Sequence, residues 1–522
     1  MRGVGSRGLK VCILALGVLW ARPAFAGGFE IPATGTESAG RGGAWTARAD
    51  NAFAGWYNPA KLSALDGVDL RLSIHAPRWN SCYQRAGTYG SYQEMQEMDE
   101  LGPNVSGTED DLSRFGRLSD YADERFPEVC NEAGFGINPS LMTSFEVHDR
   151  IGLALGVVSP AGSGKNTWGS KSGVVEGVTG EERAAPSRYM QAFTDATVFR
   201  FVFAGGFELT PWLRLGAGFL WGMGFTDTST YATPFAGERP GQDIRVDLRD
   251  MKDMFIPGAV ASLHAHPLDT LELALSFQYS DDIKSEGRGR LSFADFATTT
   301  NTTEDGATVP SSTGWMDGVT LQVPQFMTLR FGARWALPRS KVPQDRAWDP
   351  MLDEVFDIAL DVAWERNSRV DAFRVAMPEN TIDIGVQPDF ELTAPVPEET
   401  IQEKGFQDQV TVHLGGDYNV VPGRLALRTG FSFESNGYDQ PLVQIDFQPG
   451  THFGLHLGMT ARFGGFELGL AYAHIFQKDM VVSEEDAALR QIVTLEPGAV
   501  INAGRYRNSW DLLSLGLAYR FN

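Results

Sequence analysis

The chain has 522 residues, a formal net charge of −22 at pH 7 and a mean hydropathy of −0.19. So acidic a chain repels phosphates, which argues against a nucleic-acid partner. Beyond the N-terminus no stretch offers the roughly 18 apolar residues of a transmembrane helix. Composition alone would suit a large secreted protein, but the strands of an outer-membrane barrel are only half apolar and give the same composition.

The first 26 residues have the pattern of a secretory signal peptide. Three basic residues precede an apolar run at 11–19, and Ala24-Phe25-Ala26 is a small-residue cleavage site. The apolar run is too short to span a bilayer, so a membrane anchor is the weaker interpretation. Cleavage after Ala26 would leave a mature chain with a charge of −26 in a compartment that permits disulfides.

Residues 27–66 contain 7 Gly and 9 Ala, carry Asn58-Pro59-Ala60 and show no sustained helix or strand period. A compact, small-residue segment placed before a barrel has few uses. We expect it to lie inside the barrel and close it as a hatch. The expected organisation is a signal peptide at 1–26, a hatch at 27–66 and a transmembrane β-barrel with long extracellular loops at 67–522.

The rest of the chain alternates with period two. In residues 513–521 the odd positions are apolar or aromatic, and the even positions are Ser, Gly, Ala and Arg. Side chains of a strand point to opposite faces, so one face is greasy and the other small or polar. A face rich in Gly and Ala suits a lumen that holds a plug and water better than the solvated face of a soluble sandwich.

Very short connections alternate with long polar ones, as periplasmic turns and extracellular loops do in outer-membrane barrels. The predicted fold is therefore all-β, a transmembrane antiparallel β-barrel of about 14 strands, an even number as bacterial single-chain barrels require. The strands are expected near residues 68–76, 135–147, 150–160, 191–208, 212–226, 254–265, 270–283, 318–335, 356–370, 408–420, 424–434, 451–463, 466–478 and 509–521.

Motifs of catalysis are missing from the sequence: it has no H-E-x-x-H, no C-x-x-C and no G-x-S-x-G. Gly162-Ser163-Gly164-Lys165 resembles part of a phosphate loop, but the first glycine of that motif is missing and Asn166 follows the lysine. His264-Ala265-His266 ends a strand, and an exposed pair at a turn is the better interpretation than a metal site. We therefore expect no enzyme, no cofactor and no metal.

Cys82 and Cys130 are the cysteines that remain after signal cleavage, and both lie in a polar, acidic stretch. In an oxidising compartment we expect them to be bridged and to brace one long loop. A metal pair is the alternative, but nearby ligands with suitable spacing are lacking.

Several motifs resemble the hatch of the long-chain fatty acid outer-membrane transporter family (FadL/TodX-type, OmpP1-like). The barrel is similar as well, at Pro324-Gln325 and at Arg428-Thr429-Gly430-Phe431, and the resemblance covers essentially the whole mature chain. The hatch motifs are Gly28-Phe29-Glu30-Ile31, Ala39-Gly40-Arg41-Gly42-Gly43-Ala44, Asp50-Asn51-Ala52 and Asn58-Pro59-Ala60.

The resemblance implies a passive outer-membrane transporter for hydrophobic molecules, most of all long-chain fatty acids. The substrate would land among extracellular loops, enter a pocket near the N-terminus and leave sideways through a gap in the wall. That gap would lie where the third strand is kinked beside Asn58-Pro59-Ala60. The expected partners are a hydrophobic small molecule, outer-membrane lipid and lipopolysaccharide, and the barrel assembly machinery. We expect a monomer in the outer membrane of a Gram-negative bacterium.

One feature of the residues supports the gap independently. The third predicted strand reaches Ser159-Pro160-Ala161-Gly162, where proline cannot donate to a ladder and glycine permits a bend. An interrupted wall leaves backbone groups that need partners, and the Asn58 amide could supply them. The alternative is that Pro160 merely ends the strand at the outer surface.

A fatty-acid pocket needs a basic residue in an apolar lining. The candidates are Gly28, Phe29 and Ile31 for the lining and Lys404, Arg428 and Arg188 for the head group. Gln407 stands where the resemblance leads us to expect a lysine. An aromatic or alkane hydrocarbon is therefore the alternative substrate, and a general diffusion porin or structural barrel is the second alternative.

Overall fold

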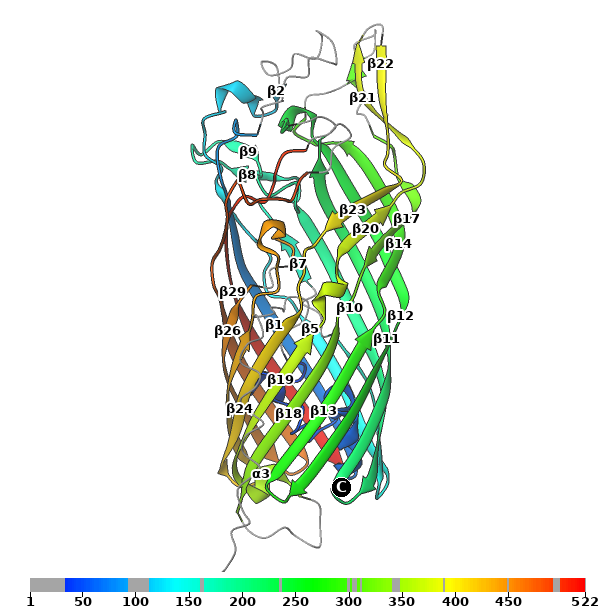
Figure 1. Cartoon of the computed structure of the whole chain (residues 1–522), viewed down its shortest axis with the longest axis vertical. Coiled ribbons are helices and arrows are strands. Elements are labelled where there is room, and N and C mark those ends of the chain that lie inside the picture. Colours follow the sequence, from blue (N-terminus) through cyan, green and yellow to red (C-terminus); the bar gives the residue numbers. More distant parts are fainter. Residues whose placement is uncertain are drawn as a thin grey trace, which may run out of the picture.

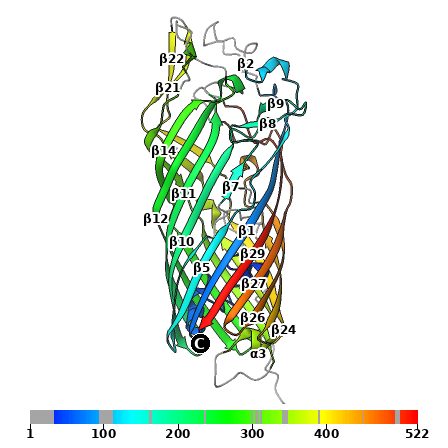
Figure 2. The ribbon, with the colours of Figure 1, turned by 180° about the vertical axis from the view of Figure 1, so that it is seen from behind.

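The protein is a tall, closed barrel in a computed structural model (Figure 1). The structure describes residues 33–92, 112–159, 164–233, 237–297, 301–302, 308–309, 312–339, 348–387, 390–447, 450–491 and 498–521. Fourteen antiparallel strands form the wall, as predicted. The wall closes where β1 pairs with β29 along its whole length, from Val68 opposite Phe521 to Arg85 opposite Gly504. Figure 2 shows these two strands with β5 beside them.

Four of the fourteen strands are interrupted in their upper parts and resume along neighbouring strands, so each is given as two segments. The wall consists of β1 (Val68–Arg85), β5 (Asn138–His148), β6 (Ile151–Val158), β10 (Phe193–Thr210), β11 (Leu213–Ala232), β12 (Ile244–Leu268), β13 (Leu271–Ser280) with β14 (Ile283–Phe293), β17 (Met316–Val323) with β18 (Met327–Pro338), β19 (Glu354–Glu365) with β20 (Ala372–Ala376), β23 (Glu399–Glu403) with β24 (Gln409–Val421), β25 (Leu425–Glu434), β26 (His452–Phe463), β27 (Phe466–Gln477) and β29 (Gly504–Phe521).

Several strands are longer than the sequence pattern indicates. β1 continues to Arg85 and β12 begins at Ile244, because their ladders extend beyond the apolar belt. We call the end with the short turns and the C-terminus the lower end, and the end with the long loops the upper end (Figure 1). In outer-membrane barrels these are the periplasmic and extracellular ends respectively.

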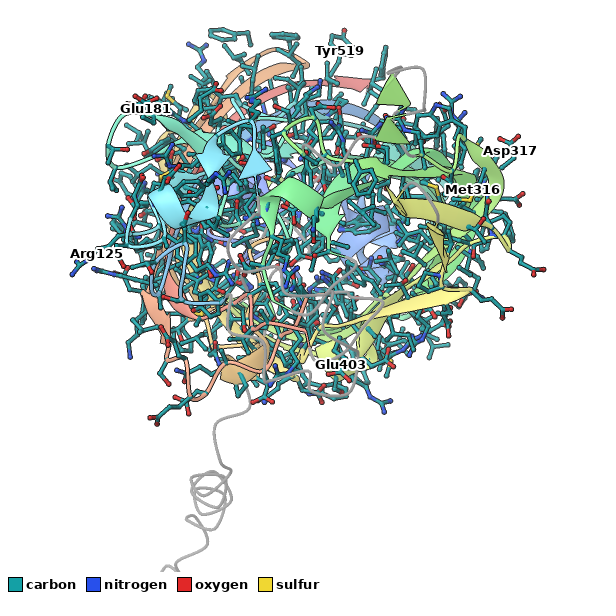
Figure 3. The ribbon with its side chains drawn as sticks, turned by 90° about the horizontal axis from the view of Figure 1, so that it is seen from above. Arg125, Glu181, Met316, Asp317, Glu403 and Tyr519 are labelled. Carbon is teal, nitrogen blue, oxygen red and sulfur yellow. A yellow bond between two sulfur atoms is a disulfide. The ribbon has the colours of Figure 1, made fainter. Side chains whose placement is uncertain are left out.

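The period-two pattern sorts side chains as the sequence indicates. Leu513 and Leu515 are exposed on the outer wall, whereas Ser514 between them is 1% exposed. Viewed from above, wall side chains such as those of Asp317 and Tyr519 radiate outward (Figure 3). Apolar side chains that face outward lose nothing in lipid, so the lumen is left for small and polar groups.

Short elements complete the chain. Among the described residues no helix is long and apolar enough to cross a membrane. The helices are α1 (Thr36–Gly40), α2 (Ala54–Tyr57), η1 (Pro59–Ala64), η2 (Leu118–Asp120), η3 (Pro240–Gln242), α3 (Pro350–Asp353), η4 (Asn367–Arg369) and η5 (Gln440–Leu442). The short strands are β2 (Leu112–Ser113), β3 (Gly116–Arg117), β4 (Glu128–Cys130), β7 (Gly164–Thr167), β8 (Val174–Glu176), β9 (Glu182–Ala184), β15 (Asn301–Thr302), β16 (Thr308–Val309), β21 (Thr381–Gln387), β22 (Phe390–Pro395) and β28 (Met480–Val482).

Candidate functional site

The N-terminal segment 33–66 fills the lower lumen, where Figure 1 shows it in dark blue inside the wall. Its backbone is bonded to inward side chains of distant strands. The amides of Trp45 and Thr46 donate to Asp361 Oδ2 at 2.9 and 2.7 Å. His413 Nδ1 donates to the Gly42 carbonyl oxygen at 2.6 Å. Buried backbone groups require such partners, so these bonds fix the segment as a plug.

A network of buried charges joins the plug to the wall; we call it the hatch ion network. Asp357 lies at its centre, 2.8 Å from Arg41 Nη2, 2.9 Å from Arg48 Nη1 and 2.7 Å from Arg334 Nε. Buried charges persist only when each is paired, and removing one partner leaves the others uncompensated. The network consists of Arg41, Arg48, Lys61, Glu272, Arg334, Glu354, Asp357, Asp417 and Arg428.

Glycines on the inner wall make room for the plug. A methyl group on Gly430 would lie 2.2 Å from the carbonyl carbon of Arg41, and one on Gly216 would lie 2.0 Å from the amide nitrogen of Ala60. Real side chains do not approach so closely, so any larger residue at these positions would displace the hatch backbone. The Gly-rich inner face inferred from the sequence is therefore the seat of the hatch.

The predicted gate residues Asn58, Pro59 and Ala60 lie at the start of η1, fully buried. Asn58 Nδ2 donates to the Thr46 carbonyl oxygen at 2.8 Å, and the Ala60 amide donates to Ser262 Oγ at 2.9 Å. In the part of the chain that the structure describes, the Asn58 side chain makes no hydrogen bond to the third strand. Its amide instead stiffens the hatch from within.

The ladder of the third strand breaks between β6 and β7. Val158 pairs with Arg200 of β10, and the next pair joins Gly164 to Ala196. Five residues, 159–163, thus stand opposite three, 197–199. The third strand carries two residues more than a continuous ladder would need.

Of the residues predicted at this break, only Ser159 is described. Its amide donates to Ser140 Oγ at 3.3 Å, and its hydroxyl donates to the Val198 carbonyl oxygen at 3.2 Å. The structure does not describe Pro160, Ala161 and Gly162. The pocket residues Gly28, Phe29 and Ile31 also lie outside the described range.

The upper lumen is filled by a large apolar cluster that gathers residues from many loops; we call it the upper apolar cluster. Its aromatic members stack on one another, for example Tyr83 on Tyr506 with ring centroids 4.8 Å apart. Such a lining suits a hydrophobic ligand. Its larger buried members are Tyr83, Trp168, Tyr189, Met190, Tyr231, Phe296, Phe406, Tyr438, Val443, Ile445, Leu489, Ile501 and Tyr506.

Arg188 lies beside this cluster and is fully occupied. Its Nε donates to Asp243 Oδ2 at 2.6 Å and its Nη2 donates to Tyr189 Oη at 2.7 Å, with Glu238 3.7 Å away. Burial would lower the pKa of Arg188, but the carboxylates of Asp243 and Glu238 raise it. Burial raises the pKa of Asp243 to about 6, against the lowering effect of Arg188.

Lys404 is also buried and paired. Its Nζ donates to Gln444 Oε1 at 2.7 Å and to the carboxylate of Asp446, and it lies 4.2 Å from the ring centroid of Phe373. Burial lowers its pKa, and Asp446 opposes that effect.

Arg428 belongs to the hatch ion network in the lower lumen. Its Nε is 3.0 Å from Asp417 Oδ2, and it also contacts the Thr460 hydroxyl. The structure thus places Arg188 and Lys404 beside the upper cluster, through Tyr189 and Phe406, and Arg428 with the hatch. Sequence reasoning missed the carboxylates that occupy all three. Isolated acidic residues at inward-facing strand positions were the available signal.

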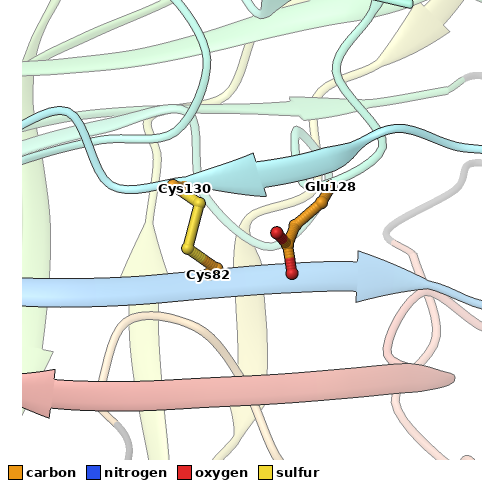
Figure 4. A group of neighbouring side chains, drawn as sticks. All are labelled: Cys82, Glu128 and Cys130. Carbon is orange, nitrogen blue, oxygen red and sulfur yellow. A yellow bond between two sulfur atoms is a disulfide. The ribbon is translucent and has the colours of Figure 1, made fainter. Parts of the chain in front are cut away.

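Cys82 and Cys130 are joined by a disulfide between directly opposed residues of β1 and β4 (Figure 4). Glu128 lies close to both sulfurs, close enough for the three residues to hold a metal ion. A metal prefers free thiolates, however, and here each sulfur is bonded to the other. The Glu128 carboxylate is moreover bound by Arg507, with Oε2 2.5 Å from Nη2.

His264 differs from the sequence interpretation. The expected exposed turn pair is wrong for this residue, since its side chain is 1% exposed and its Nε2 lies 2.8 Å from Glu272 Oε2. Glu272 in turn contacts Lys61 and Arg334 of the hatch ion network. The residue therefore extends that network, because it lies on the inward face of β12.

Comparison with known proteins agrees with this architecture. A family model described as outer membrane protein transport protein (OMPP1/FadL/TodX) matches residues 17–521. A search of curated proteins finds no match. The fold is similar to that of a Pseudomonas aeruginosa FadL homologue, with 16% identity and a TM-score of 0.64 over 95% of this chain and 100% of that one.

Two toluene transporters are similar in fold as well. The Pseudomonas putida transporter TodX has 14% identity and a TM-score of 0.57, over 94% of this chain and 98% of that one. The Ralstonia pickettii transporter TbuX has 12% identity and a TM-score of 0.53, with the same coverage. Because the family model spans nearly the whole chain, the protein belongs to the OMPP1/FadL/TodX family and is a Gram-negative outer-membrane transporter of hydrophobic molecules.

Proposed function

We propose that the protein captures uncharged hydrophobic molecules, such as aromatic or alkane hydrocarbons, in the upper apolar cluster and releases them sideways at the break in the third strand. The observation that carries the choice of substrate is the pairing of the cations beside the cluster. Arg188 already contacts Asp243 and Glu238, and Lys404 already contacts Asp446.

A fatty-acid carboxylate at Arg188 would share one guanidinium with two carboxylates. Like charges at such distances repel strongly where water is excluded. A hydrocarbon needs no counter-charge, and it gains about 25 cal/mol for each Å² of apolar surface removed from water. The described cations therefore favour a neutral substrate.

The direction of release follows from the hatch. Passage down the lumen would break the hatch ion network, at a cost of about 3–5 kcal/mol for each unpaired buried charge. Release through the wall leaves the network intact. On this ground we propose the lateral gate at Ser159, Pro160, Ala161 and Gly162, with Asn58, Pro59 and Ala60 as the rigid hatch segment that blocks the downward route. The same network opposes a general diffusion porin.

Long-chain fatty acids are the second candidate. Lys404 has one carboxylate partner and one neutral partner, Gln444, and it lies against the ring of Phe373. A cation in apolar surroundings is what a fatty-acid head group requires. The likeness to a FadL homologue adds support to this candidate, as the likeness to toluene transporters does to the first.

Uptake of labelled toluene and labelled oleate, each compared between a deletion strain and the same strain carrying the protein, separates the candidates. We expect toluene uptake above the deletion background and oleate uptake at background. Oleate uptake alone would replace the first candidate with the second. Sugar permeation in liposome swelling, with neither substrate taken up, would contradict both.

A further inference from the structure

The wall has two rims where the third strand is interrupted. The lower rim is the common end of β5 and β6, where Leu141 pairs with Val157 and the Ser159 amide is bonded to Ser140 Oγ. The upper rim consists of Cys82, Cys130, Asn131, Asn166 and Thr167. It connects β1 to β10 through the short strands β4 and β7.

Asn131 is the hub of the upper rim. Its amide donates to the Ser81 carbonyl oxygen at 2.8 Å, which continues the contact that the disulfide makes with β1. Its side-chain Nδ2 donates to Asn166 Oδ1 at 2.7 Å, and its Oδ1 accepts from the Thr167 amide at 3.0 Å. The next residue, Glu132, donates its amide to the Thr167 carbonyl oxygen at 2.9 Å. β7 is thus tied to β4 by both the donor and the acceptor of one side chain.

Between the rims, backbone of the two flanking strands lies outside the ladders. β1 pairs with β5 as far as His75 and resumes with β4 at Cys82, and β10 has no paired residues at 197–199 on this side. Outside the barrel at this level, Phe135 and Ile137 are 57% and 66% exposed, as residues in contact with lipid can be. Unpaired strand backbone at a membrane favours any rearrangement that pairs it.

Closure of the break would be compatible with the side-chain pattern. The third strand is offset by two residues across the break, and a slip of two residues keeps every side chain on its own face. The inward and outward alternation therefore does not resist a slip of β7 toward β6. A different device has to hold the two rims apart.

We propose that Cys82, Cys130 and Asn131 are positioning residues that keep the upper rim in register and so keep the lateral exit open. The disulfide joins directly opposed residues, so β4 cannot slip along β1, and Asn131 transmits that register to β7. This inference rests on the proposed lateral release, but it concerns residues outside the break itself.

The test compares the wild-type protein with Cys82→Ser/Cys130→Ser, which leaves no free thiol. We expect toluene uptake by the variant to fall roughly tenfold, since gating motions rather than binding would limit it. Toluene binding to the purified variant should stay unchanged, and its barrel should remain heat-modifiable. Hydrogen exchange in peptides covering 197–199 should slow, because closure pairs them. Uptake and exchange equal to wild type would overturn the inference.

Two substitutions of Asn131 make a second test if the serine variant does not assemble. Asn131→Leu removes both side-chain contacts with β7, whereas Asn131→Asp keeps an acceptor for the Thr167 amide. We expect reduced uptake for the first and near wild-type uptake for the second; equal uptake in both contradicts the inference. A wild-type protein without toluene or oleate uptake would instead contradict the proposed function, so the two failures are distinguishable.

Discussion

The lower and upper halves of the lumen are filled by opposite chemistry. Below, Arg41, Arg48 and Arg334 converge on Asp357, and glycines of the wall fit the hatch backbone. Above, aromatic and aliphatic side chains pack together with only local ion pairs beside them. Charge networks are rigid and punish any missing partner, whereas apolar contacts tolerate exchange with another apolar molecule. The contrast separates a part that stays fixed from a part that can accept substrate.

The largest effect is expected from Asp357→Ala. Three arginines would lose their common partner, so the free energy of unfolding should fall by about 3–5 kcal/mol. Urea unfolding of the refolded barrel measures this change. The matched control is Asp479→Ala, at an exposed pair with Arg505, which should cost less than about 1 kcal/mol. Equal effects of the two substitutions would show that the hatch ion network does not hold the plug.

A smaller effect is expected from Gly206→Ala, which tests where the hatch segment sits. The added methyl would lie 2.3 Å from the Pro59 carbonyl oxygen, so the hatch must shift, at a cost of about 1–3 kcal/mol. Ion conductance through planar bilayers should rise. The adjacent Gly205→Ala is the control, because its methyl meets only the Leu153 side chain at 3.1 Å. Unchanged conductance in both variants would contradict the tight seat of Pro59.

The barrel could be predicted from sequence because its signal is local. Alternation with period two, short turns and long loops are each visible within about ten residues, and they gave the strand number. The hatch was also predictable, since Gly and Ala on the inner wall match Gly and Ala in the segment. In both cases neighbours in the chain carry the information.

The partners of charged side chains could not be predicted in this way. Arg41 meets Asp357 and Asp417 only because the hatch enters a closed barrel, and Lys404 meets Asp446 through the fold of an upper loop. Such pairings depend on register among distant strands, which period-two patterns do not specify. The contact of Asn58 with the third strand stays a prediction, because the described bonds of its side chain lie within the hatch.

The upper lumen offers the smallest and most specific test, Asp243→Asn. The pKa of Asp243 is raised to about 6, so its carboxylate is charged above that pH and neutral below it. When it is neutral, Arg188 loses its nearest counter-charge, 2.6 Å away, and can accept an anion. A linear alkyl sulfonate stays anionic throughout, so its affinity for the wild type should increase roughly tenfold, about 1.4 kcal/mol, from one unit above that pKa to one unit below. The asparagine variant should bind it with the higher affinity at both values of pH, whereas toluene affinity should not change in either protein. Sulfonate binding that ignores both pH and the substitution would mean that Arg188 is not what excludes anions, and the preference for neutral substrates would then rest on Lys404 alone.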